Sequence, residues 1–185
     1  MRLHPGTPAP RFETEDFLGA PVRLDALLGR PVLLSFYRYA SCPLCNLRVR
    51  ELMGHQSELE ASGLALVGVF QSPRHEIARH VGRQDATFPL VPDPSMDLYR
   101  RYGVERSPWA MFSGSVIRDA LRAMRAGFRP GRIDGPLDRL PADFLIAPDG
   151  TVAVPYYAEH QSDHLPVEGI KRWLSARAGA SDPLA

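Results

Sequence analysis

The feature that most constrains this chain is a pair of cysteines placed between an apolar run and a helix-like segment. Residues 32–37 read Val-Leu-Leu-Ser-Phe-Tyr, a nearly continuous apolar stretch typical of a buried strand in a parallel sheet. A Cys-Pro-Leu-Cys motif follows at 42–45, and apolar residues then recur at helical spacing to about Ser62. A second apolar run occupies residues 64–70. This order predicts a βαβ unit with the cysteine pair at the start of its helix.

Composition limits what the pair can do. Cys42 and Cys45 are the only cysteines, which excludes a multi-disulfide scaffold and a four-thiolate zinc site within one chain. The 22 basic and 21 acidic side chains nearly cancel, so we expect no nucleic-acid partner. No signal peptide is visible, and no stretch reaches the roughly 20 apolar residues of a membrane span. We therefore expect a cytoplasmic location, where thiols are kept reduced and close cysteine pairs are catalytic or metal-binding.

The remaining pattern predicts further alternating elements, with no internal repeat and no linker. We expect a helical turn at 25–29, a helix capped by Ser72 and ending near Val81, a strand at 88–91, helices at 93–102 and 115–127, a strand at 144–147, a hairpin turn at 148–150, a strand at 152–157 and a helix at 167–178. One domain over residues 1–185 is the expectation, with its core at about 5–178 and a flexible tail at 179–185.

Four segments in this order resemble one known family. They are Gly-Thr-Pro-Ala-Pro-Arg-Phe at 6–12, the lead into the first long strand at 29–38, the Cys-Pro-x-Cys motif, and Leu-Pro-Ala-Asp-Phe-Leu-Ile at 140–146. Together they resemble the peroxiredoxin-like (AhpC/TSA) family of the thioredoxin-fold superfamily, in its CxxC-containing bacterial branch. The resemblance implies an α/β thioredoxin-like fold whose central mixed sheet is flanked by helices. It also implies an N-terminal extension, and a helical insertion within 104–139 before the strand that carries a cis proline.

The resemblance further implies a function. It predicts a thiol-dependent oxidoreductase in antioxidant defence, with no cofactor and with an external reductant of the thioredoxin or glutathione type. In the thioredoxin fold a cis proline lies against the cysteine pair and exposes backbone for an extended substrate. We therefore expect a cis bond before Pro141, with Leu140 and Pro141 binding substrate, although X–Pro bonds are cis in only about 5% of cases.

One departure from the family pattern bears on the reaction. Typical peroxiredoxins carry a proline after the Phe-Tyr pair, then a threonine, then the peroxidatic cysteine three residues later. Here Arg38 replaces the proline, Cys42 falls in the threonine position and Cys45 in the peroxidatic position. The usual peroxide-binding motif is therefore absent, and hydroperoxides and protein disulfides both stay open as substrates.

The position of the pair predicts a division of labour. Cys42 lies near the helix N-cap, where unpaired N–H groups and the positive end of the helix dipole favour a thiolate. Cys45 lies about one turn inside, so we expect Cys42 to attack and Cys45 to resolve the product. Arg38 stabilises the Cys42 thiolate or, in the alternative, points from the strand end into solvent. A shared zinc site with His160 and His164 is a further alternative.

The segment at 115–129 offers a function of another class. Its apolar residues fall on one helical face and its arginines on the next. They are Ile117, Leu121, Met124 and Phe128, and Arg118, Arg122, Arg125, Arg129 and Arg132. The simpler interpretation is a core-facing helix with a solvated basic edge. The alternative is a cover over the site or the docking surface of a non-enzymatic redox sensor, enlarged by Trp109 and Phe112. A homodimer is compatible with either.

Overall fold

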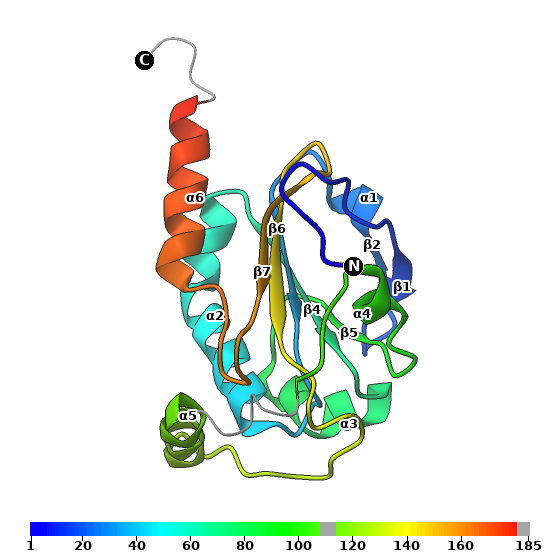
Figure 1. The fold of residues 1–185 in the computed structure, drawn as a ribbon, viewed down its shortest axis with the longest axis vertical. Helices are drawn as coiled ribbons and strands as arrows, with labels where there is room; N and C mark the ends of the chain where they lie inside the picture. Colours follow the sequence, from blue (N-terminus) through cyan, green and yellow to red (C-terminus); the bar gives the residue numbers. More distant parts are fainter. Residues whose placement is uncertain (108–113, 181–185) are drawn as a thin grey trace.

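A computed structural model describes residues 1–107 and 114–180 (Figure 1). Its central sheet has the order β5 (Leu90–Pro92), β4 (Ala65–Phe70), β3 (Val32–Phe36), β6 (Ala142–Ile146) and β7 (Val152–Tyr157). β3 is parallel to β4 and antiparallel to β6, so the sheet is mixed. A separate hairpin joins β1 (Glu13–Glu15) to β2 (Pro21–Arg23).

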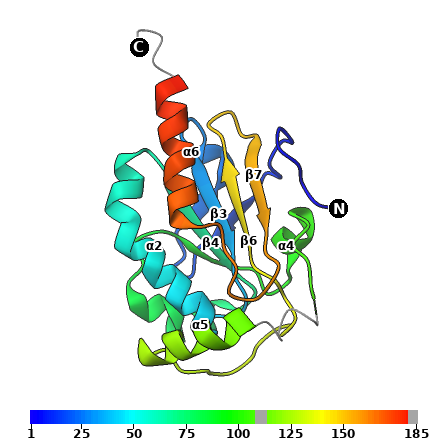
Figure 2. The same cartoon turned by 60° about the vertical axis from the view of Figure 1, so that its left-hand side comes forward.

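Helices cover both faces of this sheet (Figures 1 and 2). They are α1 (Leu24–Leu27), α2 (Pro43–Ala61), α3 (Arg74–Arg79), the 3-10 helix η1 (Val81–Gln84), α4 (Asp97–Arg101), α5 (Gly114–Arg125) and α6 (Val167–Ala180). On one face, α2, α3 and α6 bury apolar residues against Leu33, Leu66 and Leu145. On the other, α1, α4 and the N-terminal segment pack on Leu34, Val67 and Phe144. The expected thioredoxin-like arrangement is confirmed.

The βαβ unit forms as the sequence predicts. Every residue of β3 and β4 is buried, because both strands lie inside the sheet with helices on either side. α2 begins at Pro43, whose missing N–H costs nothing in the first turn, and the chain leaves the helix through Gly63 at φ 80°. The hairpin of β6 and β7 also lies where it was expected.

Two predicted helix starts are wrong. Ser72 does not cap α3, because its hydroxyl accepts the Ala40 N–H at 2.7 Å and bonds Asp134 at 2.8 Å instead. α4 begins at Asp97 and not at residue 93. The Asp93 carboxylate accepts the N–H groups of Asp97 and Leu98, so residue 93 caps the helix from outside.

The expected cis bond before Pro141 is also wrong, since the peptide is trans. The Leu140 N–H donates to the Glu105 carbonyl at 3.2 Å, and Arg106 pairs with Arg139 in an isolated bridge. The segment therefore enters β6 already extended. Proline is accepted there, at the entry to a strand, where it removes no needed ladder donor.

Helix α5 is inserted before β6 as expected, but its orientation is not the expected one. Its small residues Ala120 and Ala123 pack toward the protein, whereas Ile117, Leu121 and Met124 are exposed. The simpler interpretation of a core-facing apolar stripe is thus wrong. Trp109 and Phe112 lie outside the described residues. α6 runs to Ala180, two residues into the predicted tail, and residues 181–185 lie outside the described part.

Candidate active site

The cysteine pair lies at the start of α2, directly beyond the end of β3 (Figure 2). Cys42 is the N-cap residue, with extended backbone at φ −68° and ψ 119°. The Asn46 side chain braces this turn, because its amide donates to the carbonyls of Ala40 at 2.7 Å and Cys42 at 2.9 Å. Gln84 of η1 in turn donates to the Asn46 side-chain oxygen at 3.0 Å. The helix start is therefore held by side chains that the sequence did not single out.

Arg38 turns inward toward both sulfurs. Its Nη1 lies 3.7 Å from Cys42 Sγ, and its backbone N–H donates to Cys45 Sγ at 3.4 Å. Its Nη2 donates to the Leu137 carbonyl at 2.6 Å, and the guanidinium lies over the Tyr39 ring. Only 3% of Arg38 is exposed. The alternative of a solvent-directed arginine is therefore wrong, and the cation sits where it stabilises a thiolate.

The two thiols have opposite acidities. A hydrogen bond from Cys45 lowers the pKa of Cys42 to about 6 against the cost of burial, and the Arg38 charge and the backbone N–H groups of Leu44 and Cys45 lower it further. Burial raises the pKa of Cys45 well above its ordinary value, and the Cys42 thiolate raises it further. One thiolate and one thiol is thus the favoured state of the reduced pair near neutral pH.

A loop of residues 128–139, the covering loop, closes over the pair. Ser41 Oγ donates to the Arg132 carbonyl at 2.6 Å, Ser72 Oγ bonds Asp134 at 2.8 Å, and Gln71 donates to the Pro136 carbonyl at 3.2 Å. Cys42 and Cys45 are each 1% exposed beneath it. The structure around the pair, of which this loop is part, must therefore open before a reagent reaches either sulfur.

Two glycines of the covering loop account for its close approach to the neighbouring residues. A Cβ on Gly131 would lie 2.8 Å from Ser41 Cβ, and one on Gly135 would lie 2.5 Å from the Gln71 amide. Such distances require the loop backbone to approach its neighbours more closely than any larger residue allows. Gly131 and Gly135, with Pro130 and Pro136, are typical of a loop, but the residues that they contact are distant in the chain.

The predicted substrate-binding residues lie at the entry to β6. Both are buried, and one backbone group of each is already engaged. The Leu140 N–H bonds Glu105, and the Pro141 carbonyl accepts the Ala158 N–H at 3.3 Å. These two groups are therefore not free for an extended peptide.

A buried ionic group lies behind the site, and sequence reasoning missed it. Asp143 Oδ2 accepts the Leu165 N–H at 2.7 Å and lies 3.0 Å from His164 Nδ1. Burial opposes ionisation of Asp143, but His164 and Arg48 outweigh it and lower its pKa to about 2. Arg48 donates to the Leu165 carbonyl at 2.6 Å and to Glu51 at 2.7 Å. The group ties β6, α2 and the segment before α6 together.

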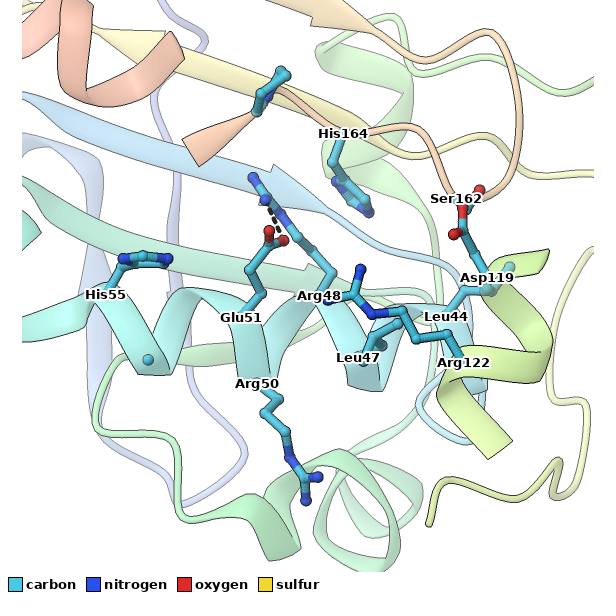
Figure 3. Close-up of a pocket in the computed structure, with 12 residues that line it drawn as sticks. Leu44, Leu47, Arg48, Arg50, Glu51, His55, Asp119, Arg122, Ser162 and His164 are labelled. Carbon is cyan, nitrogen blue, oxygen red and sulfur yellow. Dashed lines mark hydrogen bonds and ion pairs between the residues drawn. The ribbon is translucent and has the colours of Figure 1, made fainter. Parts of the chain in front are cut away.

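This group borders a cavity of about 480 Å³ between α2 and α5 (Figure 3). His164 points into it from one side, and Arg122 and Asp119 of α5 approach Leu44 and Leu47 of α2 from the other. The zinc alternative requires His164 to lie beside the cysteines. His164 contacts Asp143 instead. Within residues 1–107 and 114–180, no three His, Cys, Asp or Glu side chains are grouped to hold a metal ion.

A dithiol at the N-cap of a βαβ helix, on a mixed sheet of this order, defines a thioredoxin-fold thiol oxidoreductase. The family within that class follows from comparison with known proteins. The chain belongs to the AhpC/TSA family, whose sequence profile matches residues 5–154. It is therefore an enzyme of the thiol peroxidase or thiol–disulfide oxidoreductase type, in place of the non-enzymatic sensor considered from the sequence.

Individual relatives agree with this assignment. A protein of Mycobacterium tuberculosis (strain H37Rv) whose name places it among the peroxiredoxins is 32% identical over 174 residues, which are 94% of this chain and 96% of the relative. Peroxiredoxin Bcp of Escherichia coli K12 is 28% identical over 102 residues, 55% of this chain and 65% of its own. The crystal structure of peroxidoxin BcpB from Mycobacterium tuberculosis superposes with a TM-score of 0.69 at 20% identity, covering 98% of this chain and 100% of that one.

Proposed function

We propose that this protein reduces small hydroperoxides through Cys42 and Cys45, with Cys42 as the attacking thiolate. The observation that carries the proposal is the contact between Arg38 Nη1 and Cys42 Sγ at the start of α2. An arginine charge and a helix N-terminus both stabilise a thiolate, which is the nucleophilic form of cysteine. Cys45, whose pKa is raised, keeps its proton and remains available for the second step.

The reaction cycle uses the sulfurs of Cys42 and Cys45 and an external thiol reductant. The Cys42 thiolate attacks the terminal oxygen of ROOH, forming Cys42 sulfenic acid and, with one proton, releasing ROH. The Cys45 sulfur then attacks the sulfenic sulfur, which forms the Cys42–Cys45 disulfide and releases water. An external dithiol of the thioredoxin type, or two equivalents of a monothiol such as glutathione, reduces the disulfide and is itself oxidised. The cycle needs no metal and no third cysteine.

Two features favour a small oxidant over a protein disulfide. Each cysteine is only 1% exposed beneath the covering loop. A small molecule needs a narrower opening than a folded protein does to reach such a site. The Leu140 N–H and the Pro141 carbonyl are also already bonded within the protein, which leaves fewer backbone groups for an extended polypeptide. Protein-disulfide reduction is the second candidate, supported by the CxxC motif itself.

Stopped-flow oxidation of the reduced protein separates the two candidates. A second-order rate constant with hydrogen peroxide or an alkyl hydroperoxide well above that of free cysteine supports the proposed activity, and the Cys42→Ser protein should lack it. A rate no faster than that of free cysteine, together with rapid reduction of a protein disulfide, would replace the proposal with the second candidate.

We further propose that the enzyme works in the cytoplasm, where a thiol pool keeps the pair reduced between turnovers. In the described part of the chain, every helix is too short or too polar to cross a bilayer. The proposal that residues 1–185 act as one domain rests on the contiguous sheet and its two apolar faces.

A further inference from the structure

The outward face of α5 is unusual for a soluble helix. Of the seven large hydrophobic side chains exposed in the described residues, five lie between 117 and 137. They are Ile117 (64% exposed), Leu121 (47%), Met124 (46%), Ile133 (51%) and Leu137 (39%). The first three are spaced at i, i+4 and i+7, so they form one stripe along α5. The other two lie on the covering loop, which continues from α5.

A basic stripe runs beside this apolar stripe. Arg118, Arg122 and Arg125 follow Ile117, Leu121 and Met124 by one residue each, and Arg129 continues the series past the helix end. All four are exposed. The only carboxylate on α5 is Asp119, which is 21% exposed and paired with Arg118. The whole chain has a net charge of only +1, so this positive charge is local.

We propose that α5 and the covering loop dock on an anionic lipid surface. We call the docking face the α5 face: the stripe of Ile117, Leu121 and Met124 with Arg118, Arg125 and Arg129 beside it, followed along the chain by Ile133 and Leu137 of the covering loop. Arg122 lines the cavity toward α2 and is not part of this face. A helix with apolar residues on one side and arginines beside them lies in the plane of a bilayer interface, with the apolar side chains in the acyl boundary and the arginines at anionic headgroups.

Shape and charge favour this occupant over others. α5 lies at one end of the molecule near the start of α2, and both views place it at the outer edge of the fold (Figures 1 and 2). A helix at the outer edge of the fold is accessible to a flat, deformable surface. A second copy that packed α5 against α5 would place arginine against arginine, with Asp119 already paired, and like charges oppose that contact.

Docking through this face would bring the buried dithiol to the bilayer. The Leu137 carbonyl holds Arg38, and the Arg132 carbonyl holds Ser41 next to Cys42. The segment that carries two of the exposed apolar residues is therefore the one that covers the pair. A surface that engages Ile133 and Leu137 acts directly on that cover.

Co-sedimentation of the full-length reduced protein with lipid vesicles tests the proposal. The protein should bind vesicles of phosphatidylglycerol and phosphatidylcholine, should not bind vesicles of phosphatidylcholine alone, and should be released by salt. Arg125→Glu should weaken binding at least about fivefold, since one arginine near an anionic surface is worth about that factor. Leu121→Glu should weaken it as much.

Two matched variants are the controls. Leu18→Glu changes a leucine in the loop between β1 and β2 that is more exposed (76%) than Leu121 (47%), and Arg30→Glu reverses an exposed arginine just before β3. Neither should alter binding. Absence of binding to the anionic vesicles, or equal losses in the controls, would overturn the proposal, and so would self-association that Leu121→Glu abolishes without any vesicle binding. No oxidant enters the assay and Cys42→Ser should bind normally, so a failure here is distinct from a failure of the thiol chemistry.

Discussion

The Nη1 nitrogen of Arg38 lies 3.7 Å from the sulfur of Cys42, and both side chains are buried under the covering loop. The same residue binds Cys45 through its backbone N–H and the covering loop through Nη2. Arg38 thus links the acidity of one thiol, the position of the other and the closure of the site.

Removing the arginine charge should slow the attacking thiol. In Arg38→Met the pKa of Cys42 should rise from about 6 toward the ordinary value of 9.0. The Cys45 hydrogen bond, which lowers it most, remains, so the rise is partial and the thiolate fraction at neutral pH should fall by up to about tenfold. The rate of oxidation by peroxide at pH 7 should fall by a similar factor and recover as the pH is raised. Arg30→Met, which removes an exposed arginine before β3, should leave the rate unchanged. A rate in Arg38→Met equal to that of the wild type would contradict the role given to Arg38.

Serine variants should separate the roles of the two cysteines. Cys42→Ser should abolish turnover. Cys45→Ser should still react once and then stop, because no thiol remains to displace the sulfenic acid on Cys42. Mass spectrometry after treatment with peroxide and the sulfenic-acid reagent dimedone should find the adduct on Cys42. An adduct on Cys45 in the Cys42→Ser protein, formed at the wild-type rate, would reverse the assignment.

Loosening the covering loop should expose the pair. In Gly131→Ala the new Cβ would lie 2.8 Å from Ser41 Cβ and from His80 Cε1, so the loop must shift relative to Ser41, the neighbour of Cys42. Alkylation of Cys42 by iodoacetamide at fixed pH should then become several-fold faster. Gly54→Ala on α2 is the matched control, because a Cβ at Gly54 would meet no atom within 4 Å. Equal rates in both variants would show that the loop does not limit access.

The buried Asp143 should matter for stability and its pH dependence. Asp143→Asn breaks an ionic group with His164 and Arg48, and such losses cost about 3 kcal/mol of unfolding free energy. The folded-state pKa of about 2 is below the ordinary 3.8, so the stabilisation is present above about pH 4 and is lost as the pH falls toward 2. Urea unfolding of the reduced protein between pH 2 and 6 should show this slope in the wild type and a flatter one in the variant. Equal pH dependence of the unfolding free energy in the two proteins would contradict the role given to Asp143.

The parts of the fold that the sequence predicts well are those with local causes. The strands and helix around the cysteines follow from periodicity, a proline at the first helical position and a glycine at the end. The hairpin after β6 follows from its Pro-Asp-Gly turn. Cys42 and Cys45 were therefore placed correctly at the helix start from the sequence.

The parts that failed depend on partners far along the chain. Ser72 carries a typical capping side chain, but its hydroxyl serves Ala40 and Asp134, which lie 32 and 62 residues away. The stripe of Ile117, Leu121 and Met124 reads as a core face, yet the smaller alanines of α5 pack inward. Sequence periodicity gives the stripes of a helix but not which stripe the protein buries.

The pH dependence of alkylation at each cysteine of the reduced protein, read by peptide mass spectrometry, shows directly which sulfur is the attacking thiolate. Cys42 should be labelled first, with a midpoint near pH 6, and Cys45 should stay unlabelled through neutral pH. Labelling of Cys45 before Cys42, or a Cys42 midpoint near the ordinary value of 9.0, would contradict the assignment of Cys42 as the attacking thiolate.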